Sequence, residues 1–144
     1  MSVIERSALV SYSAQQMFAL VNDIEAYPQF MAGCSAAKIL RRGDDWLEAQ
    51  LEINRGGVKQ SFTTRNTLVE PVSMSMELLE GPFSKFSGLW EFQILSDSAC
   101  KVVFTLDFTF SNPLMGMMMK GVFENVASEQ VKSLCGRAKV IYSE

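Results

Sequence analysis

The residue types that most often carry catalysis are sparse in this chain and poorly spaced for it. The 144 residues include no histidine, which removes Ser-His-Asp and Cys-His pairs, imidazole acid/base chemistry and nearly all common zinc sites. The three cysteines, Cys34, Cys100 and Cys135, contain no Cys-x-x-Cys pair, and no obvious cationic neighbour activates Cys34 as a thiolate. We therefore expect no catalytic residue and no metal site.

Carboxylates are frequent, but they alternate with apolar residues in segments of strand-like pattern. Glu48, Glu52, Glu77, Glu91 and Asp107 fall on the polar side of these segments. On a half-buried strand the polar side faces solvent. These carboxylates should therefore be solvated rather than paired in a cleft, and the sequence indicates a protein that is not an enzyme.

Length and composition describe a small globular protein. Apolar residues make up 48% of the chain and charged residues 20%, which is ordinary for a folded domain. A chain of this length can bury well over half of the surface that its unfolded form exposes. We expect a single domain over residues 1–144.

Charge and the N-terminal sequence limit the partners and the compartment. A formal charge of −3 argues against a protein that depends on a broad electrostatic grip on nucleic acid, and we expect no DNA partner. Glu5 and Arg6 interrupt the first apolar stretch, so it is not a signal peptide, and no run approaches the roughly 20 apolar residues of a membrane span. We expect a cytoplasmic protein, with peripheral contact at the inner membrane as an alternative.

Hydrophobic periodicity predicts the elements that must position any site. A strand over 2–11 precedes a capping-box pattern at Ser13 and Gln16, which begins a short helix over 14–24, and Pro28 makes 25–34 a turn or loop. From Ala36 the apolar period changes from 3.6 to 2, and turn signals separate six further strands. These strands are predicted at 37–41, 46–54, 58–68, 72–79, 86–95 and 101–110.

The last element is predicted to be a long amphipathic helix over 114–142. Asn112 is a typical N-cap and Pro113 suits the first helical position. Apolar residues then recur at spacings of three and four from Phe123 to Ile141. No other element is long enough to cover a one-faced sheet of seven strands, so an α+β fold with the antiparallel sheet curled around this helix is expected.

The element order and four phrases of the sequence resemble the coenzyme Q-binding START-domain family. The phrases are DIEAYPQF (23–30), SFTTRN (61–66), EGPFSKFSGLWEF (80–92) and DFTFSNPLM (107–115). This family is the polyketide cyclase-like branch of the helix-grip superfamily, and its bacterial members include the RatA-type ribosome association toxins. The resemblance covers nearly the whole chain and implies a START/Bet v 1-like helix-grip fold with an apolar cavity between sheet and helix.

The resemblance implies two functions. The first is non-enzymatic binding of ubiquinone, or of another polyprenyl quinone or lipid, in support of respiration, with the quinone as a bound ligand and no other cofactor. The second is binding to a ribosomal subunit so that 70S association is blocked. Seven basic residues could form a local patch for that purpose: Arg41, Arg42, Lys59, Arg65, Lys132, Arg137 and Lys139. We rank the quinone first, because its apolar requirement is visible in the sequence.

The inward faces of the predicted elements supply the candidate ligand-binding residues. Apolar pockets left between a wide sheet and a single helix are where small ligands bind, although the same residues could simply fill a core. The candidates are Phe62, Thr64, Met74, Met76, Trp90, Phe92, Phe104 and Phe108 from the sheet and Met115, Met118 and Val122 from the helix.

Polar side chains on the apolar side of 58–68 leave two alternatives open. Gln60, Thr64 and Asn66 share the side of Phe62. Facing a cavity, they could hydrogen-bond a quinone carbonyl or methoxy group, or water, whereas a register shift at a bulge would turn them outward. Arg65 falls on the opposite side, where we expect it to pair with a carboxylate of a neighbouring strand.

The stretch PLMGMMMKGVF (113–123) suggests a cavity mouth at the start of the long helix. Methionine adapts to irregular apolar partners, and glycines such as Gly116 and Gly121 each cost a helix roughly 1 kcal/mol relative to alanine. We expect a movable apolar rim here, facing Tyr27, Phe30 and Met31, with membrane contact as a further option. The alternative is an ordinary helix turn packed on the loop at 27–31.

Overall fold

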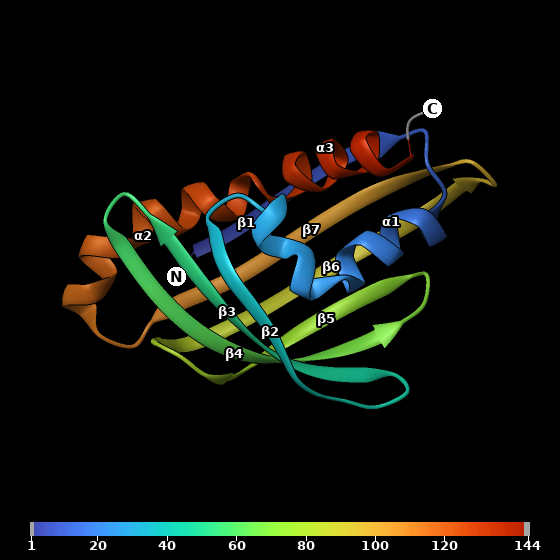
Figure 1. The fold of residues 1–144 in the computed structure, drawn as a ribbon. Coiled ribbons are helices and arrows are strands. Elements are labelled where there is room, and N and C mark those ends of the chain that lie inside the picture. The colour runs from blue at the N-terminus through green and yellow to red at the C-terminus, as the bar shows by residue number, and fades with distance from the viewer. Residues whose placement is uncertain (1, 143–144) are drawn as a thin grey trace.

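The computed structural model describes residues 2–142, which form one antiparallel sheet and four helical segments (Figure 1). The strands are β1 (Ser2–Val10), β2 (Cys34–Arg42), β3 (Trp46–Arg55), β4 (Val58–Val69), β5 (Ser73–Glu80), β6 (Phe83–Ser96) and β7 (Ala99–Phe110). The helical segments are α1 (Ala14–Asn22), the 3₁₀ helix η1 (Ile24–Gln29), α2 (Pro113–Ser128) and α3 (Gln130–Tyr142).

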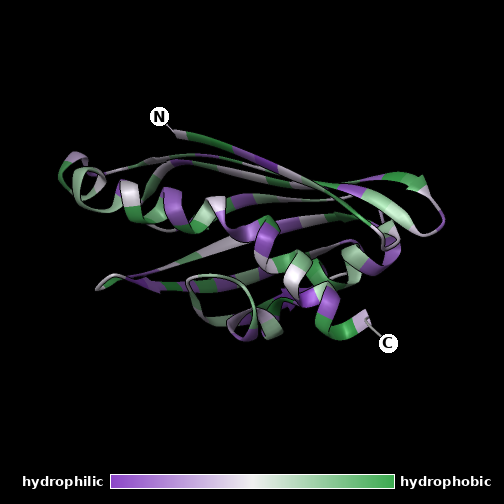
Figure 2. Ribbon diagram, turned by 90° about the horizontal axis from the view of Figure 1, so that it is seen from above, coloured by the Kyte–Doolittle hydropathy of each residue, from purple (hydrophilic) through white to green (hydrophobic). Residues whose placement is uncertain are grey.

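The sheet has the order β1-β7-β6-β5-β4-β3-β2, with every neighbouring pair antiparallel. Figure 1 shows it curving beneath α2 and α3, while α1 and η1 lie over its concave side. Figure 2, viewed from above, shows hydrophilic and hydrophobic segments mixed along α2 and α3, as amphipathic helices require. The predicted helix-grip fold is confirmed.

Local sequence signals set the starts of the helices. Ser13 Oγ accepts a hydrogen bond from the Gln16 backbone N–H at 3.0 Å, and Gln16 Oε1 accepts one from the Ser13 N–H at 2.9 Å. Asn112 Oδ1 accepts from the N–H of Leu114 at 2.9 Å, and Pro113 occupies the first helical turn of α2. Side-chain oxygens thereby satisfy N–H groups that have no partner within the helix.

The single long helix predicted for 114–142 is interrupted at Glu129. There the backbone tightens, because the Glu129 N–H donates to the Val126 carbonyl at 3.2 Å in a 3₁₀-like turn. Ser128 Oγ also donates to the Asn125 carbonyl at 2.8 Å, a side-chain bond of the kind that bends helices. The apolar stripe continues across the break, since Phe123, Ala127 and Val131 are all buried.

A bulge in β6 turns two phenylalanines inward. Phe83 pairs with Phe110 and Lys85 with Thr109, which leaves Ser84 as the extra residue. The strand therefore begins three residues before the predicted Phe86, and both Phe83 and Phe86 are buried. Their rings join a cluster with four others, Phe62, Phe108, Phe110 and Phe123.

The two edges of the sheet are β1 and β2, and β2 is irregular along its length. Ser35 and Leu40 are extra residues at two register shifts against β3. Between them, the Ile39 N–H donates to Glu25 Oε2 of η1 at 3.3 Å. A side chain of the neighbouring helix therefore takes a hydrogen-bonding position of the edge strand.

Shortening a buried side chain of α3 should destabilise the whole fold. Leu134 is fully buried, so Leu134→Ala is expected to lower the free energy of unfolding by about 2–5 kcal/mol. Val140→Ala on the same helix is the control, because Val140 is 71% exposed and its truncation should stay within about 0.5 kcal/mol. Urea unfolding followed by circular dichroism measures both changes, and equal effects would contradict the packing of α3 on the sheet.

Candidate functional site

An apolar cavity lies between the concave face of the sheet, η1 and α2. Strands β2 to β7 all contribute side chains to it, as do η1, α2 and the first residue of α3. Its volume is about 70 Å³, which holds a few water molecules and is well below the roughly 300–1,000 Å³ of typical ligand pockets. A ligand with a ring therefore requires the walls to move.

Small residues account for the empty space. Ala49 of β3 and Ala127 of α2 both line the cavity, and each is almost fully buried. A larger aliphatic side chain at either position would extend into the space that remains. The most adaptable wall groups are Met31 and Met76, whose unbranched side chains can change rotamer.

Two buried polar side chains of β4 face the cavity. Thr64 and Asn66 alternate inward with Phe62, and each is 1% exposed. The register shift at this position lies in β5, where Leu79 is the extra residue, so it leaves the alternation of β4 intact. The inward alternative is therefore the one observed for Thr64 and Asn66, whereas Gln60 is half-buried outside the cavity lining.

These two side chains satisfy each other only in part. Thr64 Oγ1 donates to Asn66 Oδ1 at 2.7 Å, and Asn66 Nδ2 reaches the Met74 sulfur at 3.7 Å. A thioether is a weak acceptor. A carbonyl oxygen entering the cavity would give the Asn66 amide a stronger partner than Met74 provides.

The ionisable groups in the cavity wall are neutral at physiological pH. Burial raises the pKa of the Cys34 thiol to about 11, so almost none of it is a thiolate at pH 7. Burial also raises the pKa of Tyr27, whose hydroxyl donates to the Val21 carbonyl. The remaining lining residues are apolar or uncharged, so the wall is chemically suited to an apolar molecule that carries one or two hydrogen-bonding groups.

Five of the eleven predicted ligand-binding residues line this cavity: Phe62, Thr64, Met76, Trp90 and Phe104. Met74, Phe92 and Phe108 are buried elsewhere in the core. Phe92 packs edge-on to Phe18, with 6.1 Å between ring centroids, and Phe108 lies within the phenylalanine cluster.

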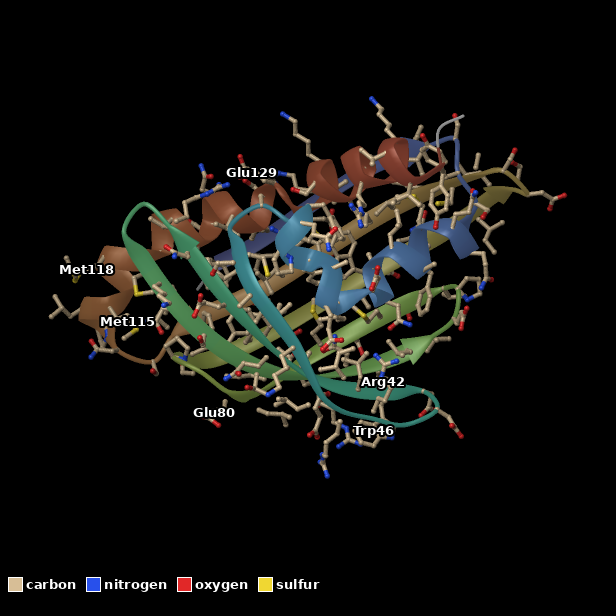
Figure 3. All side chains as sticks on the ribbon, in the orientation of Figure 1. Arg42, Trp46, Glu80, Met115, Met118 and Glu129 are labelled. Atoms are coloured by element: carbon tan, nitrogen blue, oxygen red, sulfur yellow. The ribbon has the colours of Figure 1, made fainter. Side chains whose placement is uncertain are left out.

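The predicted contribution of the first turns of α2 to the cavity is wrong. Met115 and Val122 are half-buried outside the lining, and Met118 is 71% exposed (Figure 3). The physical reason is the length of α2, whose first inward residue to reach the cavity is Phe123. Earlier residues lie beyond its end.

The residues predicted to form the cavity mouth also fall into two groups, those that line the cavity and those that do not. Tyr27 and Met31 line the cavity, whereas Phe30, Gly116 and Gly121 do not. A Cβ at Gly116 would meet Phe110 at 3.5 Å, so this turn packs on β7 rather than on 27–31, and a Cβ at Gly121 would meet nothing within 4 Å. A movable rim at α2 stays a prediction, but its position is away from the cavity.

Sequence reasoning omitted several lining residues that carried a signal. Ala49, Leu51 and Ile53 alternate inward along β3, and that alternation is plain in the sequence. Val126 and Gln130 had no such signal. Gln130 Nε2 donates to the carbonyls of both Ala32 and Val126, at 3.1 and 2.9 Å, so it ties the segment before β2 to α2.

That segment approaches α2 closely at Gly33. Its φ of +75° is a conformation that favours glycine. A Cβ at this position would come within 2.7 Å of Val126 Cγ2. Both the backbone conformation and the contact with α2 therefore require glycine, and together they fix the wall that carries Met31.

The basic residues of the chain fall into separate groups. Arg65 and Arg41 both hydrogen-bond the Glu48 carboxylate on the outer face of the sheet, at 3.3 and 2.9 Å, as predicted for Arg65. The Arg41 hydrogen bond lowers the pKa of Glu48. Glu48 is 8% exposed and thus more buried than its position on the polar side of β3 predicts. Lys132, Arg137 and Lys139 lie on α3 instead.

Neither a metal centre nor a membrane span is found in the described part of the chain. Among residues 2–142, no three His, Cys, Asp or Glu side chains are grouped as metal ligands. Within the same range, every helix is too short or too polar to cross a bilayer.

Comparisons with known proteins agree with this architecture. Residues 10–135 match the family described as polyketide cyclase / dehydrase and lipid transport. The ribosome association toxin RatA of Escherichia coli is 43% identical over 99% of this chain and 90% of that protein. The mitochondrial coenzyme Q-binding protein coq10 of Schizosaccharomyces pombe is 25% identical, over 93% of this chain and 85% of that protein.

Among solved structures, the Zhui aromatase/cyclase of Streptomyces sp. R1128 has a similar fold. It superposes with a TM-score of 0.83 at 19% identity and covers 99% of this chain and 97% of its own. At that identity the likeness establishes the shared fold alone.

Removing the Thr64 hydroxyl should destabilise the protein from within the cavity wall. Thr64→Val keeps the side-chain shape but leaves the buried Asn66 Oδ1 without its donor, which should cost about 1–3 kcal/mol of unfolding free energy. Thr67→Val on the exposed side of the same strand is the control. Urea unfolding measures the difference, and a Thr64→Val protein as stable as the control would contradict the buried pair.

Proposed function

The chain belongs to the polyketide cyclase / dehydrase and lipid transport family, and from that premise we propose that it is a ribosome-association factor of the RatA type. It binds a ribosomal subunit, in the cytoplasm, and prevents the two subunits from joining. The observation that carries this proposal is the 43% identity to Escherichia coli RatA over 99% of this chain and 90% of that protein. Similarity of this extent includes every helix and strand of the fold.

This proposal reverses the order in which the sequence alone ranks the two functions. The cavity of about 70 Å³ is smaller than a quinone ring needs, so the physical requirement that favoured the quinone is met only after the walls move. The relative named for coenzyme Q is also more distant, at 25% identity.

A non-catalytic mode of action agrees with the chemistry of the cavity. Its titratable wall groups, Cys34 and Tyr27, are neutral at pH 7, and the lining includes no carboxylate. Proton transfer at the site would need a group that changes charge near neutral pH. This chemistry supports the proposal that the protein acts by binding.

Ribosome profiles test the proposed function directly. When the protein is added to purified 30S and 50S subunits before Mg²⁺ is raised, the 70S peak in a sucrose gradient should fall and both subunit peaks should rise. Because the proposed effect is on joining, preformed 70S ribosomes should respond less. A heat-denatured sample is the control, and an unchanged ratio of 70S to free subunits would rule the function out.

A second function, binding of an apolar ligand, is favoured by one specific observation. Asn66 is 1% exposed, faces the cavity, and has only the Met74 thioether as acceptor for its amide. A quinone carbonyl would complete its hydrogen bonding while the ring displaces Met31 and Met76. We propose ubiquinone or another polyprenyl quinone or lipid as this ligand, with no other cofactor. The two functions are compatible, since the fold does not choose between them.

Filling the cavity should weaken ligand binding without changing the surface. Ala127→Leu places three additional carbon atoms in the cavity and should weaken binding of decylubiquinone by about tenfold or more. Ala36→Leu makes the same change at an exposed position of β2 and should bind as the wild type does. Fluorescence titration and mass spectrometry of extracted lipid give the readout. If the wild type shows neither saturable binding nor a co-purified lipid, the ligand function is wrong.

A further inference from the structure

A second, open groove lies on the outer side of α3, apart from the apolar cavity. It has a volume of about 430 Å³ and runs between α3 and the segment 29–32. We call it the α3 groove and define it by Phe30, Arg55, Lys132, Gly136, Arg137 and Val140, all of which line it. Phe30 was predicted at the cavity mouth, but it lines this groove and not the cavity.

Positive charge is concentrated on α3, beside this groove. The chain carries a formal charge of −3, yet α3 contains Lys132, Arg137 and Lys139 and no acidic residue from Gln130 to Tyr142. Among residues 2–142, Glu129 is the one carboxylate that lines the groove, and it forms an ion pair with Arg55. Lys132 and Arg137 therefore leave the groove with a surplus of positive charge.

The other group of basic residues lacks such a surplus. Arg41 and Arg65 share the carboxylate of Glu48, and both guanidinium groups also lie over the Trp46 ring, at 5.7 and 4.3 Å. Asp44 and Asp45 precede Trp46 in the hairpin. Figure 3 shows Arg42 and Trp46 at the end of this hairpin, far from Glu129.

The α3 groove also contains a flat platform. The Arg137 guanidinium lies over the Phe30 ring with its Cζ 5.0 Å from the ring centroid, and its Nη2 donates to Gln29 Oε1 at 3.4 Å. Phe30 in turn packs edge-on to Tyr27, which is anchored in the core. Unstacked RNA bases are bound on such aromatic rings and guanidinium planes.

The groove is open because α3 has a glycine at the position that faces it. A Cβ at Gly136 would meet nothing within 4 Å. Lys132 lies one helical turn before it and Val140 one turn after it, so the three residues share a face. Lys132 and Val140 thus flank a recess into which Gly136 projects no side chain.

We propose that the α3 groove binds a single-stranded segment of ribosomal RNA, with phosphates at Lys132 and Arg137 and a base against the Phe30–Arg137 platform. The inference rests on the proposed ribosome-association function and identifies its contact surface. RNA is favoured over an acidic protein segment because the groove combines surplus positive charge with a planar stacking surface. A carboxylate-rich peptide would use only the charge.

The experiment compares two charge-reversal proteins and one shape variant. Lys132→Glu/Arg137→Glu reverses the charge of the groove, and Gly136→Leu fills the recess without changing the charge. Arg42→Glu reverses an exposed cation in the hairpin between β2 and β3, away from the groove. Each protein is titrated against a fluorescein-labelled 20-nucleotide poly(U) RNA and against purified 30S and 50S subunits. Circular dichroism checks that each variant is folded.

The groove variants should lose affinity for both probes while Arg42→Glu retains it. The double reversal should weaken RNA binding by about tenfold or more and lower the salt slope of log K by about 1.4 for the two lost phosphate contacts. Gly136→Leu should weaken it by roughly fivefold or more, the lower end of the effect of losing one stacked base.

Several results would overturn the inference. If either groove variant binds as Arg42→Glu does, the groove is not the contact. If the wild type binds a subunit but not the RNA, the single-stranded RNA assignment is wrong. Groove-dependent RNA binding without any subunit binding would instead refute the proposed function and leave the groove as an RNA site, so the two failures are distinguishable.

Discussion

The packing of one phenylalanine of α2 against the sheet determines much of the architecture. Phe123 contacts the rings of Phe83 and Phe108 at centroid distances of 5.2 and 4.9 Å and also touches Phe62 and Phe110. Aromatic pairs of this kind each contribute about 0.5–1.5 kcal/mol beyond their buried area. Because these rings come from β4, β6 and β7, they fix α2 at a definite height above the sheet. The height of α2 above the sheet determines the space left for the cavity, since Val126 and Ala127, one turn after Phe123, form part of the cavity wall.

Two regions of different chemical character result from this arrangement. The interior wall combines neutral groups with one under-satisfied amide at Asn66, and the outer surface of the next helix concentrates positive charge. Gln130 lies between the two, because its side chain lines the cavity while its residue begins α3. The cavity and the α3 groove thus both adjoin the junction of α2 and α3, and each has its own chemical character.

Short-range signals predicted the fold well. Alternation along residues 101–110 and the caps at Ser13 and Asn112 depend only on neighbours in the chain, and the structure has them as expected. The bulge at Ser84 could not be predicted in this way, since it depends on register with β7. The cavity volume is the small difference between the space that the sheet and helices enclose and the space that the side chains fill. The sequence therefore could not show that Phe62 lines the cavity and that Phe108 lies in the core. Phe30 lies against Arg137, 107 positions later, and a contact over that separation has no local signal in the sequence.

The irregular edge strand has a consequence for how the protein behaves at high concentration. A regular exposed edge is a template on which another chain can add a strand. Along β2, the extra residues Ser35 and Leu40 interrupt the spacing of backbone donors and acceptors, and Glu25 already occupies the Ile39 N–H. An incoming strand would find a broken ladder, with cations at Lys38 and Arg41 beside it. At the β2 edge, the curled sheet can thus remain open and still resist the addition of another strand.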